Sequence, residues 1–538
     1  MHSLGRASAM IAAGTLVSRV TGLIRSIVLV AAIGAYGHAS DAFTIANQLP
    51  NYVFQVLSAG LITAVLVPQI VKWSSRDDGG REHLSKLFTL GAVVLFAVTA
   101  VAMAVAPWLV ALFGAEFTDD QLALGTAFAY WCLPQVFFYG MFALIGETLN
   151  ARRVFGPYAW APIVNNVVSI VGFGLFIVAF GGERSEVGQW DPAMIAVLGG
   201  VATFGIVAQT VLLLVFWRRT GLSLRPDFGW RGMGLGDIRS LAGWSFAMLV
   251  VGLVVSTVQQ RVISAASGDD ASATVWFTAW LVFMLPYSVI VMSIGTPYFT
   301  QLSEHASAGR DDEVRADIGR SVRTLGLLVV IAAVALIAAS VPAARIFTAS
   351  DTEAAAAAPV LIGFLVSLVP LAVQFIVQRT FYAYGDTRTP FLFTVFQAAI
   401  AIGLAVLMPL VVAPDHLAAA VAVCQSISSL AQVILASWLL RRRLGPLGMG
   451  ESLWALTRFT LAAIPAGAAA FGVYLVSGGA NGWMAAADVT GIAGRLLGAV
   501  GTGVVGGVAL VVYVLVLALF RAPELRTTGT LVRRLLGR

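Results

Sequence analysis

Long apolar stretches separated by short polar breaks run along the whole chain. A membrane-spanning helix needs about 20 consecutive, mostly apolar residues, and this pattern predicts fourteen such helices. We place them at residues 7–33, 42–71, 87–113, 122–150, 157–181, 192–217, 238–266, 272–303, 321–342, 355–383, 389–413, 416–440, 454–477 and 496–520. The pattern therefore predicts an all-α polytopic membrane protein.

The first apolar stretch resembles a cleaved signal peptide in its position. Arg19 and Arg25 interrupt it, however, where a signal peptide needs an unbroken apolar segment. We predict a retained first helix.

The polar breaks alternate between basic and acidic. The basic set holds Lys72, Arg76, Arg81, Lys86, Arg152, Arg153, Arg218, Arg219, Arg225, Arg231, Arg310, Arg315, Arg320, Arg323, Arg388, Arg441, Arg442 and Arg443. The alternate breaks hold only Arg184 and Arg345 among many acids. Because basic loops stay in the cytoplasm, both termini are predicted to be cytoplasmic, and an even number of spans agrees. The basic tail RTTGTLVRRLLGR is expected to lie against anionic headgroups.

A faint internal repeat predicts the domain organisation. Leu49-Pro50 is followed by Gly60, and Leu285-Pro286 is followed at nearly the same spacing by Gly295. Transporters are commonly built from such repeats, although chance similarity between apolar helices is the alternative. We expect an N-terminal lobe at 1–220, a C-terminal lobe at 221–443, and two further helices with the basic tail at 444–538.

Composition excludes a soluble protein, because 59% of the residues are hydrophobic and only 11% are charged. The net charge of +6 lies in the loops, so it indicates topology rather than nucleic-acid binding. Cys132 and Cys424 lie in apolar runs, where we expect neither a disulfide nor a metal site.

The sequence contains no phosphate-binding loop of the type G-x-x-x-x-G-K-[ST] and no cluster of catalytic or metal-ligating residues. We therefore expect neither an enzyme nor a cofactor. An intramembrane transferase would need such a cluster, and a structural scaffold would leave Arg19 unexplained. Transport would be driven by an ion gradient, the membrane potential or the substrate gradient.

Charges within membrane depth are costly and usually face a polar cavity. Arg19 and Arg25 are about 120° apart around an ideal helix, and Gly22 between them could permit a bend toward one cavity. The planar guanidinium fork suits phosphate, so the pair indicates a pyrophosphate-like anion. The alternative is that both side chains reach the headgroups.

For two other polar residues, the sequence allows two interpretations each. Asp41 either caps the second helix or takes part in function. Arg261 either reaches the headgroups or adds a cavity charge. For Glu147 and Arg379 we expect interfacial salt bridges.

Three motifs resemble those of the MurJ (MviN) lipid II flippases, of the MOP transporter superfamily. They are the segment beginning SRVTGLIRSIVLV and continuing through SDAFTIANQLPNYVF, the segment LNARRVFGPYAWAPIVNN, and the segment FYAYGDTRTPF. The resemblance implies two six-helix lobes forming a V around a cationic cavity, with two C-terminal helices making a groove toward the lipid. Arg19 and Arg25 match the family's essential arginines, and Asp41 matches its acidic residue.

The resemblance implies a flippase that moves lipid II to the outer leaflet of the bacterial cytoplasmic membrane by alternating access, in cell-wall biogenesis. We assign substrate binding to Arg19, Arg25, Asp41 and Asn51, and treat Arg261 as a further cavity charge. Expected partners are lipid II, membrane lipids and the cell-wall synthesis machinery. The alternatives are a flippase for another undecaprenyl-linked glycan, or a drug/ion antiporter, which would prefer acids in its cavity.

The chain also departs from the family pattern. Relatives carry a cavity arginine shortly after the LPN sequence, where this chain has Tyr52, Val53, Phe54 and Gln55. Another arginine expected before Pro286 is replaced by the run Trp280, Leu281 and Val282. Carboxylates proposed to bind sodium in some relatives are not evident either, since the tenth span has Gln374 and Gln378 where an acid would be needed. The cavity should therefore be less cationic.

Overall fold

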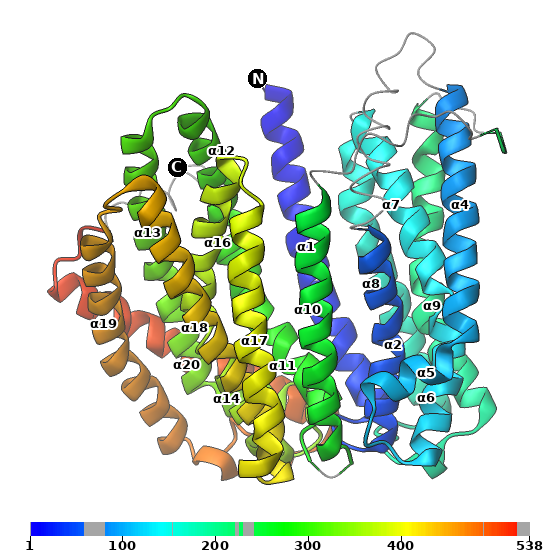
Figure 1. The fold of residues 1–538 in the computed structure, drawn as a ribbon. Helices are drawn as coiled ribbons and strands as arrows, with labels where there is room; N and C mark the ends of the chain where they lie inside the picture. Colours follow the sequence, from blue (N-terminus) through cyan, green and yellow to red (C-terminus); the bar gives the residue numbers. More distant parts are fainter. Residues whose placement is uncertain are drawn as a thin grey trace. The chain divides into compact units, whose positions relative to one another are not determined.

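The computed structural model describes residues 2–58, 81–152, 154–220, 225–229, 242–268, 270–487 and 489–524, and in this part of the chain it contains helices and no strand (Figure 1). The chain divides into two compact units, Met1–Thr274 and Val275–Arg538. Thirteen candidate spans in the described residues are long and apolar enough to cross a membrane. The polytopic all-α prediction is confirmed.

The first unit is built from nine α-helices in its described residues. They are α1 (His2–Ile33), α2 (His38–Leu57), α4 (Arg81–Ala104), α5 (Ala106–Phe113), α6 (Asp119–Cys132), α7 (Gln135–Ala151), α8 (Phe155–Phe180), α9 (Pro192–Trp217) and α10 (Ala242–Ile263). Two predicted spans are thus each made of two helices. The breaks fall next to Pro107 and Pro134, because proline lacks an N–H group and its ring clashes with the preceding turn.

Side chains cap two of these helices at their N-termini. The hydroxyl of Thr118 accepts a hydrogen bond from the Gln121 N–H at the start of α6. Oδ1 of Asp191 accepts one from the Met194 N–H at 2.8 Å, and Pro192 fills the first position of α9. Both caps satisfy backbone donors that have no partner within the helix.

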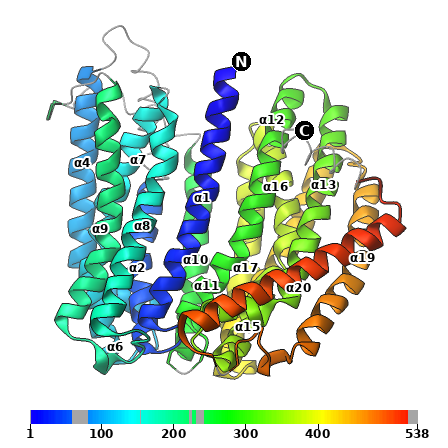
Figure 2. The same ribbon diagram turned by 180° about the vertical axis from the view of Figure 1, so that it is seen from behind.

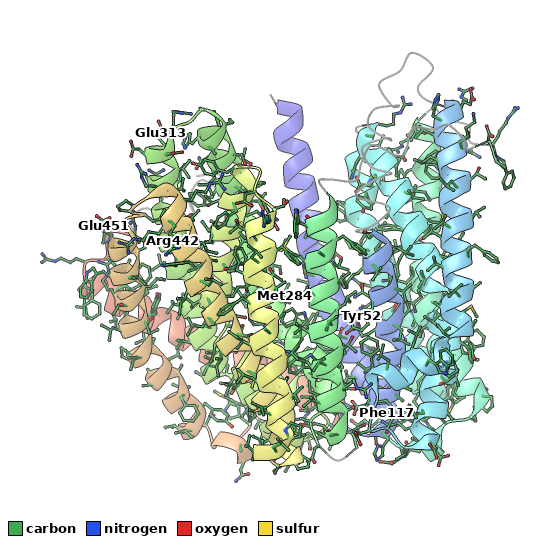
Figure 3. All side chains as sticks on the ribbon, in the orientation of Figure 1. Tyr52, Phe117, Met284, Glu313, Arg442 and Glu451 are labelled. Atoms are coloured by element: carbon green, nitrogen blue, oxygen red, sulfur yellow. The ribbon has the colours of Figure 1, made fainter. Side chains whose placement is uncertain are left out.

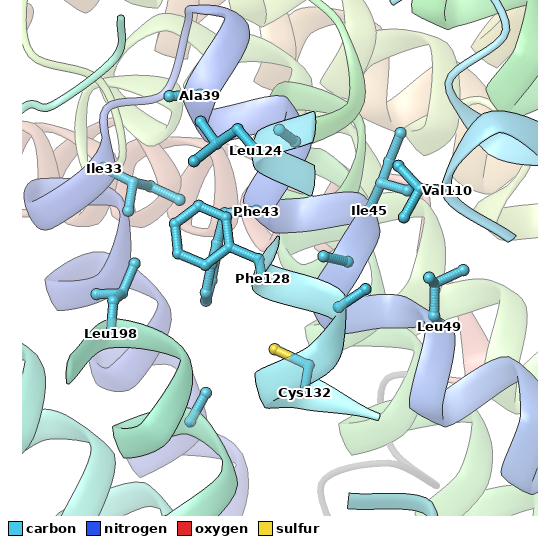
Figure 4. Packing of buried hydrophobic residues seen from close by; sticks show 14 of the residues in the cluster. Ile33, Ala39, Phe43, Ile45, Leu49, Val110, Leu124, Phe128, Cys132 and Leu198 are labelled. Atoms are coloured by element: carbon cyan, nitrogen blue, oxygen red, sulfur yellow. The ribbon is translucent and has the colours of Figure 1, made fainter. Parts of the chain in front are cut away.

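The core of the first unit is aromatic and aliphatic (Figure 4). The rings of Phe43 in α2 and Phe128 in α6 meet edge to face, with centroids 5.0 Å apart. Ile33 and Leu198 are also buried in this cluster, so α1, α2, α6 and α9 share it. Burial of apolar surface and ring packing hold together the helices that carry Arg25 and Asp41.

The second unit begins within α11 (Ala273–Pro286). It continues as the π-helical segment η6 (Tyr287–Met292), α12 (Ser293–Ser307), α13 (Asp311–Ala338), α14 (Ser340–Arg345), α15 (Asp351–Leu365), α16 (Leu368–Ala383), α17 (Arg388–Val411), α18 (Leu417–Leu444), α19 (Met449–Val476) and α20 (Gly491–Leu519). The helices α12, α13 and α16 lie side by side, as both ribbon views show (Figure 2). The two C-terminal helices, α19 and α20, pack on α13 through a core that includes Phe459 and Tyr513.

Charged side chains gather at one end of the second unit, where Glu313, Arg442 and Glu451 lie (Figure 3). We call this end, which holds the loops at 307–311, 383–388 and 444–449, the basic end of the second unit. Several arginines here form ion pairs, such as Arg310 with Glu313 at 2.9 Å and Arg323 with Glu451 at 3.4 Å. Exposed pairs of this kind contribute little stability individually.

The FYAYGDTRTPF motif turns α16 into α17 at this end. Asp386 accepts a hydrogen bond from the Thr389 N–H at 2.9 Å and one from Arg443 at 2.9 Å. The Tyr384 hydroxyl donates to Asp311, and burial together with this carboxylate raises the pKa of Tyr384 to about 12. The motif therefore forms a polar link between α13, α17 and α18.

Arg345, one of the two arginines in the acidic breaks, is only 1% exposed. Its guanidinium donates to the carbonyl oxygens of Ala485, Thr348 and Val489, two of which follow α19 in the chain. Gly494 makes room for it, since a Cβ there would lie 2.3 Å from Nη2 of Arg345. Arg345 is thus a buried structural group and not a loop charge.

Some expectations are not tested by these residues. The predicted second span, 42–71, extends into residues 59–80, which lie outside the described part. The count of fourteen spans therefore stays a prediction. Lys72, Arg76, Arg153, Arg231, Gly60 and the tail at 526–538 also lie outside it. The division at residues 220 and 443 and the V-shaped arrangement likewise stay predictions.

Candidate functional site

Arg19 and Arg25 lie inside α1, on either side of the midpoint of its candidate span Ala13–Ile33. Both side chains are partly buried. In the described part of the chain, neither guanidinium has a hydrogen bond or an ion pair. A charge at this depth is costly unless it meets water or an anion, so the two groups are available to a ligand.

Asn166 of α8 fixes the segment of α1 around Arg19. Its Nδ2 donates to the Ser18 carbonyl at 3.0 Å and to the Thr21 hydroxyl at 2.9 Å. Gly22 faces this amide, with room for a Cβ 3.6 Å from Nδ2. The helix α1 runs without interruption past this point. A Cβ at this distance would make only ordinary van der Waals contact, so the packing on α8 does not require glycine at this position. The Asn166 side chain, which sequence reasoning missed, holds α1 in place.

A polar network lies beside Arg25. Its guanidinium interacts electrostatically with Tyr139, whose hydroxyl donates to Gln135 at 3.3 Å. Gln135 is 2% exposed and donates to Asn47 and to Thr203. The network joins α2, α7 and α9 next to Arg25. A glutamine beside a proline in an apolar span was the only sequence signal for it.

Asp41 is 1% exposed and lies in the first turn of α2. Its Oδ1 accepts a hydrogen bond from the Thr274 N–H at 2.9 Å, and its Oδ2 accepts one from the Ser267 hydroxyl at 2.8 Å. Gln121 donates to the same serine hydroxyl at 2.8 Å. The carboxylate thus caps the first turn of α11 (Ala273–Pro286) and binds Ser267 in the segment after α10, and it does not cap its own helix. These protein donors satisfy it.

Asn51 and Arg261 do not join the α1 arginines. Asn51 is partly buried, one turn after Asn47 in α2, and has no hydrogen bond to another described residue. Arg261 is exposed near the end of α10 and donates to the Leu112 carbonyl at 3.3 Å. Among the described residues, no hydrogen bond or ion pair links any two of the five predicted site residues.

The salt bridges expected for Glu147 and Arg379 are not present in the described residues. Glu147 has the Asn150 side chain as its hydrogen-bond partner. The Arg379 guanidinium lies over the rings of Phe299 and Phe375, in both cases at 5.1 Å from the centroid. A charge that was expected to pair with an acid therefore lies among aromatic rings.

The positions considered for sodium also hold no acid. Gln374 is 5% exposed, and neither polar atom of its amide has a partner among the described residues. Gln378 donates to the Tyr382 hydroxyl at 2.8 Å. No group of described histidines, cysteines and acids could hold a metal ion, and Cys132 and Cys424 are free thiols.

A many-helix membrane protein with two unpaired arginines inside one span has the features of a transporter for an anionic substrate. The family model described as "Lipid II flippase MurJ" matches residues 29–487. The chain therefore belongs to the MurJ family of lipid II flippases. The matched residues begin after Arg19 and Arg25, so the role of these two side chains depends on the geometry described above.

Curated relatives cover most of the chain. A "Probable lipid II flippase MurJ" of Haemophilus influenzae is 27% identical over 411 residues, which are 70% of this chain and 75% of the relative. A protein of the same description from Synechocystis is 24% identical and spans 98% of this chain and 97% of its own.

Solved structures share the fold. "Lipid II flippase MurJ, inward closed conformation" has a TM-score of 0.71 at 18% identity, covering 95% of this chain and 98% of that chain. An inward-facing multidrug resistance MATE family transporter of the MOP superfamily has a TM-score of 0.63 at 15% identity, covering 80% and 96%. At these identities the likeness shows the fold alone.

Proposed function

We propose that this chain moves lipid II from the inner to the outer leaflet of the cytoplasmic membrane by alternating access. The observation that carries the proposal is the pair of α1 guanidinium groups, Arg19 and Arg25, which lie within a span without an acidic partner in the described chain. Each can donate two parallel hydrogen bonds to a phosphate. A pyrophosphate offers the matching oxygens and charge.

The protein's own groups would act by binding and orientation. Asn166 holds the α1 segment around Arg19, and Gln135 and Tyr139 form the polar network next to Arg25. A fixed fork loses less entropy on binding than a mobile one. The polyprenyl tail would stay in the lipid while the headgroup crosses.

The direct test is depletion of the protein in its host, followed by identification of the lipid-linked precursor that accumulates inside. Accumulation of lipid II, relieved by the wild-type chain and not by Arg19→Ala, supports the proposal. Accumulation of a different undecaprenyl-linked glycan would select the second candidate, which the apolar residues at Phe54 and Trp280 favour because they make the substrate site less cationic.

Topology has its own test. A tag in the loop at 183–191 should react with an impermeant reagent from outside, because both termini are proposed to be cytoplasmic. Labelling of the 218–239 loop instead would reverse the orientation.

The energy source is tested separately. Flipping should persist when ATP is depleted while ion gradients are clamped, since the sequence has no nucleotide-binding loop. Loss of transport under that clamp would remove the secondary-transport mechanism. Association with the cell-wall synthesis machinery stays a prediction.

A further inference from the structure

Arg379 in α16 is the basis for an inference about the second unit. It lies one turn before the end of α16 at Ala383, close to the basic end, and its side chain is partly buried. The guanidinium carbon lies 5.1 Å from the ring centroids of Phe299 and Phe375 and 6.0 Å from that of Tyr382. Three rings from α12 and α16 therefore hold this cation.

The surroundings keep the rings in place. A Cβ on Gly295 of α12 would lie 2.5 Å from Cε1 of Phe375, so only glycine lets that ring occupy its position. Gln378 donates to the Tyr382 hydroxyl at 2.8 Å and orients that ring. These two contacts fix the rings of Phe375 and Tyr382 next to Arg379.

The Arg379 guanidinium lies over these three rings, and a guanidinium carries five N–H donors. Among the described residues no acid lies within ion-pair distance of Arg379, and no hydrogen bond uses its donors. This differs from Arg443, which stacks on Tyr384 but also pairs with Asp386. Arg379 thus combines aromatic surroundings with N–H donors that no described residue accepts.

We propose that Arg379 and the rings of Phe299, Phe375 and Tyr382 form a binding site for a phosphate-type anion on the second unit. A planar guanidinium fork whose donors are unused is suited to bidentate binding of a phosphate ester or anhydride. The anion is either a lipid-carried pyrophosphate or the headgroup of an anionic phospholipid. A role as a contact for the transported pyrophosphate rests on the proposed function, whereas anion binding itself does not.

The test uses the purified full-length protein in nanodiscs of phosphatidylcholine. Undecaprenyl pyrophosphate and phosphatidylglycerol are titrated separately, and bound lipid is counted by native mass spectrometry. We compare wild type, Arg379→Gln, Arg379→Lys and the control Arg442→Gln. Arg442 is a suitable control because it lies 3.6 Å from the ring centroid of Trp438 near the end of α18, yet it is exposed.

Arg379→Gln should weaken undecaprenyl pyrophosphate binding about tenfold, and Arg379→Lys less, because lysine keeps the charge but loses the fork. Arg442→Gln should bind as wild type does. Loss of phosphatidylglycerol binding alone would also support the anion site and would assign it to phospholipid headgroups. Unchanged binding of both probes by Arg379→Gln, or an equal loss with Arg442→Gln, would overturn the proposal.

A second variant protects the test from a folding defect. Phe299→Leu keeps the arginine but removes one ring, and should weaken binding about two- to fivefold, since an exposed cation–π contact contributes about 0.5–1 kcal/mol. Unchanged lipid binding by Phe299→Leu would show that the Phe299 ring is not part of the site. If wild type binds pyrophosphate through Arg379 but does not flip lipid II, the proposed function fails and the site stands. If wild type flips lipid II and Arg379→Gln binds both lipids as wild type does, the anion site fails and the proposed function stands.

Discussion

Both units contain arginines with little or partial exposure, but the surroundings of these arginines differ. In the first unit, Arg19 and Arg25 have no hydrogen-bonding or ionic partner in the described chain. In the second unit, Arg345 is 1% exposed and donates to three backbone carbonyls, two of them in the segment after α19. The fold therefore supplies hydrogen-bond acceptors to the Arg345 guanidinium but not to those of Arg19 and Arg25.

The comparison separates a structural arginine from a binding one. Low exposure does not mark a binding arginine, because Arg345, the least exposed of the three, is the one whose donors the backbone satisfies. What differs is whether the donors are used within the protein, since unused donors at membrane depth need an external anion or water. Variants of the two regions should therefore fail in different ways.

The largest effect should come from Arg345→Ala. Three buried carbonyls would lose their donor, at a cost of about 1–3 kcal/mol each. We expect the protein to disappear from the membrane, as measured by immunoblot and by size-exclusion chromatography in detergent. Arg442→Ala, at an exposed site, is the control. Normal protein levels of Arg345→Ala would contradict the structural role of Arg345.

Next in size is the effect of Arg19 on transport. Arg19→Ala should accumulate and elute as wild type does but should not support flipping, and Arg19→Lys should retain a fraction because it keeps the charge without the fork. The readout is complementation together with lipid II that becomes accessible outside. A collapse in abundance would mean that Arg19 has a structural partner, as Arg345 does.

Asp41 tests whether a buried acid in the first unit follows the structural pattern. Asp41→Ala leaves the Thr274 N–H and the Ser267 hydroxyl without their acceptor, whereas Asp41→Asn keeps one acceptor oxygen. We expect Asp41→Ala to have the lowest melting temperature, Asp41→Asn an intermediate one and wild type the highest. Transport should fall only in proportion to the loss of folded protein. Loss of transport by a stable Asp41→Asn would support the prediction that Asp41 binds substrate.

Asn166 should have a smaller effect that acts through α1. Asn166→Ala removes two hydrogen bonds to α1, about 1 kcal/mol each, and should lower transport severalfold with little loss of protein. Asn165→Ala, on the same helix, is the matched control, because Asn165 accepts from Ser169 rather than contacting α1. Equal effects of the two variants would indicate general damage to α8.

The smallest effect is expected for Arg261→Gln. This exposed side chain makes one 3.3 Å hydrogen bond to the Leu112 carbonyl, so transport and abundance should stay within about twofold of wild type. A loss as large as that of Arg19→Ala would show that Arg261 supplies a cavity charge.

The sequence alone determined the helical class and most span positions, and it singled out Arg19 as a candidate site residue. Apolar length and intramembrane charge are properties of a local segment, so they can be read without knowing what the segment packs against. The breaks next to Pro107 and Pro134 were not predicted, since 87–113 and 122–150 were each expected to be one span, although their cause is also local. The observed helices accordingly follow the predicted ranges closely, as at α9 and α17.

Only the tertiary structure decided which polar groups are already satisfied. Asp41 meets Thr274, more than two hundred positions along the chain, and Arg345 meets Ala485 and Val489. Arg379 was expected to pair with an acid, but lies on rings brought together from α12 and α16. Hydrogen bonds and ring contacts act over a few ångströms in space, and sequence spacing does not report which distant residues the fold brings that close.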